Sequence, residues 1–135
     1  MDADTTAEKA GCAVVTVHGT FAGKPGEQVA RWWQNEAALA TRLTTCIGAR
    51  VEAFKWQDKD GPGPNRESER RIAGQQLLAR LSTLEAEQAD YHLVGHSHGG
   101  SVIWHALKLS ARANTRLKGL RSWTTVGTPF IEFGS

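Results

Sequence analysis

The sequence contains few of the features that tie a chain to an oxidising compartment or to a membrane. Its 135 residues include two cysteines, Cys12 and Cys46, which are too few for a disulfide framework and mildly indicate a reducing compartment. No apolar run approaches the roughly 20 residues that a membrane-spanning helix requires. The segment Met1–Lys9 is polar and lacks the apolar core of a secretion signal. We therefore expect a cytoplasmic protein without a membrane span.

The charge of the chain is nearly balanced. A formal net charge of +2 at pH 7 is too small to indicate nucleic acid or an anionic membrane surface as a partner. The length favours one domain, which we place at residues 12–135. A polar lead-in at residues 1–11 precedes it, and we expect this lead-in to be flexible.

Four segments have the pattern of β-strands. Cys12–Val17 is a continuous apolar, β-branched run, which is typical of a strand buried on both faces of a parallel sheet. Arg50–Trp56 alternates apolar and charged residues, which favours a strand near the edge of the sheet. Asp90–Val94 and Leu120–Val126 are the other two, and Gly127-Thr128-Pro129 ends the last one because proline cannot continue a ladder.

Three helices are expected between these strands. They run from Gly26 to about Thr45, from an Asn65 cap to about Gln88, and from Ser101 to near Arg112. The second helix carries an apolar stripe that should face the core: Ile72, Ala73, Leu77, Leu81 and Leu84. Its charges are mixed in sign and are best interpreted as a solvated face: Arg66, Glu67, Glu69, Arg70 and Arg71.

This alternation predicts an α/β fold, with a parallel sheet of about four strands and helices on both faces. With the strands numbered along the chain, fold logic favours the order 2-1-3-4. That order places the first and third strands side by side at the switch point, where ligands bind beyond the carboxyl ends of the strands.

One motif stands at the end of the third strand. Gly95–Gly100 reads Gly-His-Ser-His-Gly-Gly and lies between a predicted strand and a predicted helix, which is the context of a nucleophile elbow. A side chain at Gly95 or Gly99 would collide with the neighbouring strand and helix. Ser97 would project from the sharp turn as a nucleophile at a helix N-terminus, where backbone N–H groups favour negative charge.

A serine nucleophile also needs backbone donors for the oxyanion. One donor would be the N–H of His98, the residue after the nucleophile. The other would come from the loop after the first strand, with Thr20 as the best candidate and Phe21 next. Gly19 would let this loop turn tightly.

Three segments, Val15–Phe21, Gly95–Gly100 and Thr125–Pro129, together resemble the α/β-hydrolase fold, and more narrowly its lipase-like serine esterases. The first resembles the oxyanion loop of that family, the second its nucleophile elbow, and the third a strand end where Gly-Thr-Pro is frequent. The resemblance covers residues 13 to 130. It implies a partial hydrolase core in which His18 and His96, with the motif glycines, support the site.

The sequence departs from the family where the base should be. The triad of the family runs Ser, then Asp or Glu, then His along the chain. After Ser97 the only histidines are His98 and His105, and neither suits that geometry. The only acid is Glu132, a weak candidate. The chain would then be a truncated piece of a larger hydrolase, a domain completed by a partner chain, or a non-catalytic remnant, and we favour the first.

Several functions share these residues. The resemblance implies a hydrolase of carboxylic esters, and an acyltransferase would use the same serine. A non-catalytic interaction domain is the competing class, because the fourth strand would leave an open edge with Trp123 and Val126 on it. Its partner would be a second copy or another chain. We expect no cofactor and no metal, since the spacing of His18, His96 and His98 fits no zinc pattern.

Overall fold

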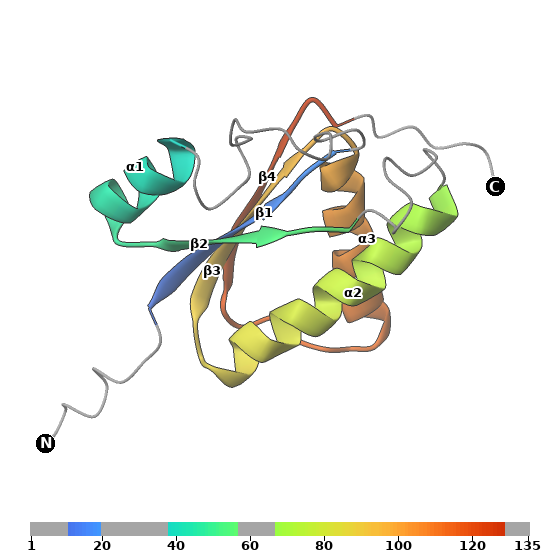
Figure 1. The fold of residues 1–135 in the computed structure, drawn as a ribbon. Coiled ribbons are helices and arrows are strands. Elements are labelled where there is room, and N and C mark those ends of the chain that lie inside the picture. The colour runs from blue at the N-terminus through green and yellow to red at the C-terminus, as the bar shows by residue number, and fades with distance from the viewer. Residues whose placement is uncertain (1–10, 20–37, 57–66, 129–135) are drawn as a thin grey trace, which may run out of the picture.

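Four strands and three helices alternate along the chain in the computed structural model, which describes residues 11–19, 38–56 and 67–128 (Figure 1). The strands are β1 (Cys12–Val17), β2 (Arg50–Phe54), β3 (Asp90–His96) and β4 (Leu120–Val126). The helices are α1 (Ala38–Ile47), α2 (Glu67–Ala86) and α3 (His98–Arg112). Residues 1–10 of the expected lead-in and residues 26–37 of the first expected helix lie outside the described residues.

The strands form one parallel sheet in the order β2-β1-β3-β4, which confirms the predicted fold class and strand order. Figure 1 shows α2 and α3 on one side of the sheet and α1 on the other. β1 and β3 are neighbours, with Val17 opposite Gly95 at their carboxyl ends. The segments that follow these two strands therefore begin side by side.

The core lies between the sheet and the pair α2 and α3. β1 is buried along nearly its whole length, as expected of a strand covered on both faces. The side chains that complete the core come from β3, α2 and α3: Tyr91, Leu93, Leu77, Leu81, Leu84, Val102, Ile103 and Ala106. α2 and α3 approach closely at Gly74, because a Cβ there would lie 2.6 Å from the Cβ of His105.

Two predictions about α2 are wrong. Ile72, assigned to the apolar stripe, is 53% exposed. Arg70, assigned to a solvated face, is only 6% exposed and donates to the Glu67 carboxylate at 2.6 Å. Both differences follow from the way in which α3 packs against the N-terminal half of α2, since the helical period alone does not fix which edge of an apolar stripe meets its neighbour.

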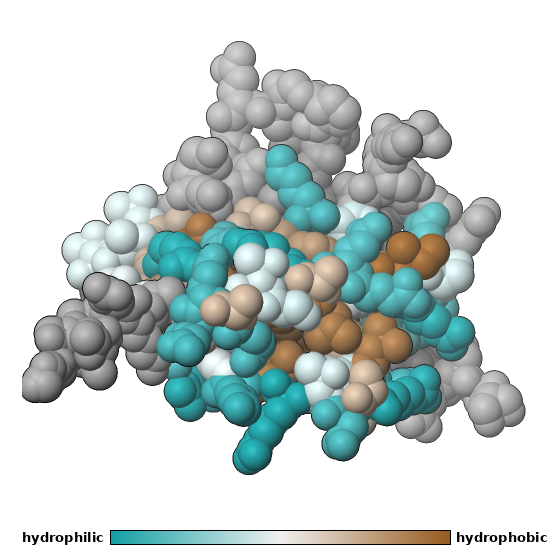
Figure 2. Space-filling view, turned by 90° about the horizontal axis from the view of Figure 1, so that it is seen from below, coloured by the Kyte–Doolittle hydropathy of each residue, from teal (hydrophilic) through white to brown (hydrophobic). Residues whose placement is uncertain are grey.

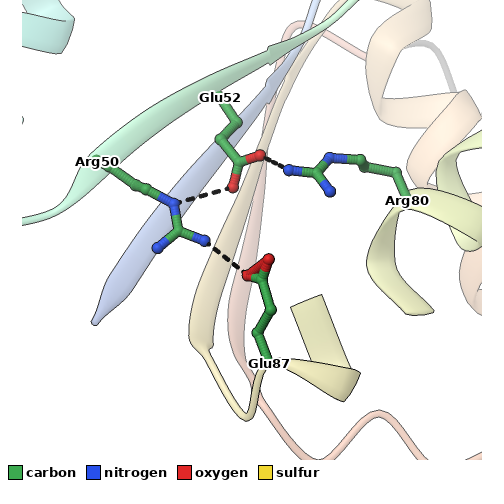
Figure 3. A network of polar contacts seen from close by, with 4 residues as sticks. All are labelled: Arg50, Glu52, Arg80 and Glu87. Atoms are coloured by element: carbon green, nitrogen blue, oxygen red, sulfur yellow. Dashed lines mark hydrogen bonds and ion pairs between the residues drawn. The ribbon is translucent and has the colours of Figure 1, made fainter. Parts of the chain in front are cut away.

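A chain of ion pairs ties the edge strand β2 to α2 and the segment after it (Figure 3). Arg50 contacts Glu52 at 3.3 Å and Glu87 at 3.1 Å, and Arg80 of α2 contacts the other oxygen of Glu52. Arg50 and Glu87 are more than two-fifths exposed, so each pair contributes little on its own. The network nevertheless fixes charged side chains on the outermost strand.

The face seen from below, on the side where α2 lies, is mainly polar, with a smaller group of apolar residues between polar ones (Figure 2). Such a mixture is ordinary for a folded surface.

None of the helices that the structure describes is long and apolar enough to cross a bilayer.

Replacement of Leu81 by Ala should lower the free energy of unfolding by about 2–5 kcal/mol, because Leu81 is fully buried and its loss leaves a cavity. Ile72→Ala on the same helix is the control and should change it by no more than about 0.5 kcal/mol. Urea unfolding of both variants measures the difference. Equal losses would contradict the described packing of α2.

Candidate active site

The turn from β3 into α3 has a strained backbone at Ser97. Its φ of 53° and ψ of −128° lie outside the regions that non-glycine residues normally adopt. The other non-glycine residues with positive φ in the described part of the chain, Gln88 and Asn114, follow the ends of helices, where such residues are common. Ser97 instead precedes a helix, so ordinary helix capping does not explain its conformation.

Glycines make this turn possible. A Cβ on Gly95 would lie 2.7 Å from the backbone nitrogen of Gly100, and one on Gly99 would lie 2.7 Å from the carbonyl oxygen of His18. Both contacts are with backbone, which cannot swing aside as a side chain can. These are the clashes expected from the sequence motif. Because glycine has no Cβ, it avoids them, and α3 can begin directly after the end of β3.

The segment after β1 lies against the serine. A Cβ on Gly19 would come within 2.9 Å of the Cβ of Ser97 and 3.4 Å of its Oγ. Only hydrogen at Gly19 leaves this approach open. The predicted meeting of the first and third strand ends at one site is therefore confirmed.

Strand β4 holds the turn from the other side. The backbone N–H of Ser97 donates to the carbonyl of Val126 at 2.8 Å. The hydroxyl of Thr128 donates to the carbonyl of Ser97 at 2.8 Å, and the N–H of Gly100 donates to the same oxygen at 3.0 Å. Both ends of the strained residue are thus fixed by hydrogen bonds.

His18 is locked against Trp56. Its Nδ1 donates to the carbonyl of Gly19 at 2.7 Å, and its Nε2 accepts from the backbone N–H of Trp56 at 3.3 Å. The indole of Trp56 donates to the carbonyl of His18 at 2.6 Å, and the two rings stack 5.6 Å apart. A carbonyl only accepts and an N–H only donates, so His18 is the neutral Nδ1–H tautomer. Its ring nitrogens are thus both in use, one on Gly19 and the other on Trp56.

A polar cluster joins the N-terminal end of α2 to the middle of α3. Glu67 accepts from Arg70 at 2.6 Å and from His105 Nε2 at 2.7 Å. Burial alone would raise the pKa of Glu67, but the hydrogen bonds to Arg70 and His105, together with the charges of these residues, lower it. Burial lowers the pKa of His98 and the charge of Arg70 adds to this effect. Burial also lowers the pKa of His105, although its bond to Glu67 opposes the shift.

The structure assembles part of the predicted site. It brings Ser97 together with Gly19, Gly95, Gly99 and the first residue of α3, His98. Thr20 and Glu132, the predicted second oxyanion donor and acid, lie outside the described residues.

No histidine is hydrogen-bonded to the hydroxyl of Ser97 within the described residues. All five histidines of the sequence are in the described part of the chain, and no hydrogen bond within that part joins one of them to Ser97 Oγ. His105 is eight residues further along α3, about 12 Å at the rise of a helix, and its Nε2 is bound to Glu67. The His98 Nδ1 is buried without a hydrogen-bond partner, so it does not reach the serine either.

Sequence reasoning missed two features. No sequence pattern indicates that Trp56 contacts His18, and only the structure shows this contact. Ser122 and His92 form a second serine–histidine pair on β4 and β3, with Oγ and Nδ1 2.6 Å apart. Ser122 is exposed and lies within β4, beside a register shift in its pairing with β3, so this pair lacks the turn and the helix N-terminus. Among the described residues, no group of three His, Cys, Asp or Glu side chains is placed to hold a metal ion.

Comparisons with protein-family models, with curated proteins and with solved structures find no match to this chain. What the site can do therefore has to follow from its own geometry.

Replacement of Ser97 by Gly should raise the free energy of unfolding by about 1 kcal/mol, because glycine relieves the strain at positive φ while losing some chain entropy. Ser97→Ala keeps the Cβ and should give no such gain. Thermal and urea unfolding of the three proteins measure this. A Ser97→Gly protein no more stable than Ser97→Ala would show that the turn stores no strain.

The buried, neutral His18 should make stability fall on acidification. Burial lowers its pKa below the ordinary 6.5, the bond to Gly19 opposes this and the charge of Lys55 adds to it. The unfolded chain therefore binds more protons below about pH 6.5, so stability is complete above that value and is lost as the pH falls through it. His18→Gln should lose less free energy of unfolding than the wild type between about pH 7.5 and 5.5. Equal losses in urea titrations would exclude this role, since the contributions of His98 and His105 have the same sign and remain in both proteins.

Proposed function

We propose that this chain carries the nucleophile half of a serine hydrolase that acts on carboxylic esters, of the lipase-like kind within the α/β-hydrolase fold. The observation that supports this most is the backbone of Ser97, which holds φ 53° and ψ −128° in a tight turn between β3 and α3. A strained conformation persists only where its surroundings impose it, and such residues concentrate at functional sites. The G-x-S-x-G turn is the setting in which a serine is presented as a nucleophile.

In the proposed reaction, Ser97 Oγ attacks the carbonyl carbon of the ester while a base takes the hydroxyl proton. The resulting oxyanion accepts a hydrogen bond from the N–H of His98, with the segment after Gly19 supplying the second donor, for which Thr20 remains the predicted residue. Each donor of this kind is worth about 3–4 kcal/mol in the transition state. Collapse of the intermediate expels the alcohol, which takes the proton from the base, and water then releases the acid by the same route.

The base is proposed to come from a group other than the five histidines of this sequence. His18 uses both ring nitrogens and His105 is held by Glu67. The chain alone should therefore react slowly. This proposal keeps the interpretation of a hydrolase completed by a further segment or by a partner chain.

The outer strand favours a second candidate, an interaction domain. Within the described residues β4 pairs only with β3, and its Trp123 and Val126 are 40% and 53% exposed. An open, partly apolar edge of this kind is suited to pairing with another strand. An acyltransferase would share every step up to the acyl-enzyme and differ only in its acceptor.

We keep the cytoplasm as the proposed compartment. Cys12 and Cys46 are both free thiols, which suits a reducing environment.

The proposal predicts that a fluorophosphonate probe phosphonylates Ser97, with fluoride as the leaving group. Intact mass should show one adduct on the wild-type chain and none on Ser97→Ala. Added imidazole should accelerate the labelling, because it acts as an external general base.

Ser122→Ala is the matched control, since Ser122 is the serine with a histidine partner outside the turn. It should be labelled like the wild type. Loss of labelling in Ser122→Ala, with Ser97→Ala still labelled, would assign reactivity to the surface pair. A folded wild-type chain that takes no label even with imidazole would overturn the hydrolase proposal and favour the interaction domain.

A further inference from the structure

The geometry points to Thr128 as the positioning residue that aims the oxyanion donor of Ser97's turn. The inference rests on the proposed function, since it concerns the N–H of His98 that would hold the oxyanion. It assigns a specific role to a side chain that comes from another part of the chain. Thr128 follows β4, 31 residues after the serine.

The first step is the planarity of the peptide bond. The carbonyl of Ser97 and the N–H of His98 belong to one trans peptide unit, so they point in opposite directions. The Thr128 hydroxyl donates to that carbonyl at 2.8 Å. By fixing the carbonyl, it fixes the direction of the N–H on the other side of the same plane.

The second step is the seat in which Thr128 lies. A Cβ on Gly100 would overlap the Thr128 hydroxyl and lie 2.8 Å from its Cβ. Gly100, the last residue of the Gly95–Gly100 motif, is therefore required for the hydroxyl to reach the turn. Gly127, with φ +63°, lets the chain bend directly before Thr128. Two glycines thus serve the placement of one hydroxyl.

The third step is the precision with which the N–H of His98 must be oriented. An oxyanion donor acts only if it is aimed in advance at the place where charge develops. The Ser97 peptide has strained dihedral angles, and without a fixed partner it would relax by rotating about them. The N–H of Gly100 also contacts the Ser97 carbonyl, at 3.0 Å, but it belongs to the same turn and would move with it. The hydroxyl of Thr128 and the carbonyl of Val126 anchor the turn to a separate strand.

The test measures the kinetics of fluorophosphonate labelling in the presence of imidazole. Thr128→Val removes the hydroxyl and keeps the shape. It should lower the maximal labelling rate about tenfold or more, with the probe concentration at half-maximal rate little changed. Thr128→Ser restores the hydroxyl and should label within about threefold of the wild-type rate. A lower maximal rate at an unchanged half-maximal probe concentration indicates that the donor is misoriented, whereas disruption of the whole site would change both values.

Thr124→Val is the matched control, because it makes the same change on β4 at an exposed residue. It should label like the wild type, and thermal unfolding should show all variants folded. Equal maximal rates for Thr128→Val and the wild type would overturn the inference while the proposed function stands. Failure of Thr128→Ser to restore the rate would also overturn it. An unlabelled wild type, by contrast, would overturn the proposed function and this inference together.

Discussion

The structure depends most on the close approach of three backbones around Ser97. The end of β3, the start of α3 and the segment after β1 come together at distances that leave no space for a Cβ at Gly95, Gly99 or Gly19. Because the strands are parallel and β1 lies beside β3, this contact links segments far apart in the sequence. The place where α3 begins and the strain of the turn both follow from this packing.

The strain at the turn is held by its surroundings rather than by local sequence. Val126 and Thr128 anchor Ser97 from β4, and His18 keeps the segment after β1 in place through its contacts with Trp56. The backbone of the turn is therefore held by the carbonyl of Val126 in β4 and by side chains that follow the three other strand ends: His18, Trp56 and Thr128. Because these contacts come from residues far from Ser97 in the sequence, mutations at those residues are expected to change the geometry of the turn.

The fold and the tight turn at Ser97 could be predicted from sequence because their signals are local. The apolar run at Cys12–Val17 and the strand–turn–helix context of Gly95–Gly100 each lie within a short segment. The clamp between His18 and Trp56 could not, since it joins residues 38 positions apart and follows no spacing rule. Arg70 stands among other charged residues in the sequence, as a solvated residue would, and its burial follows only from the packing of α3. The Gly-Thr-Pro segment was noted, but the contact of Thr128 with Ser97 depends on β4 lying beside β3.

The two edges of the sheet differ in chemistry. β2 carries Arg50 and Glu52, which are committed to ion pairs, and charged edge strands resist the addition of another strand. β4 has four consecutive exposed residues and, in the described part of the chain, a single ion pair, between Arg121 and Asp90 of β3. If β4 is open in the protein as it is among the described residues, each molecule can take part in only one edge-to-edge pairing. Pairing of two copies through β4 would use this edge of both molecules, so association would end at a closed pair and would not continue into a fibre.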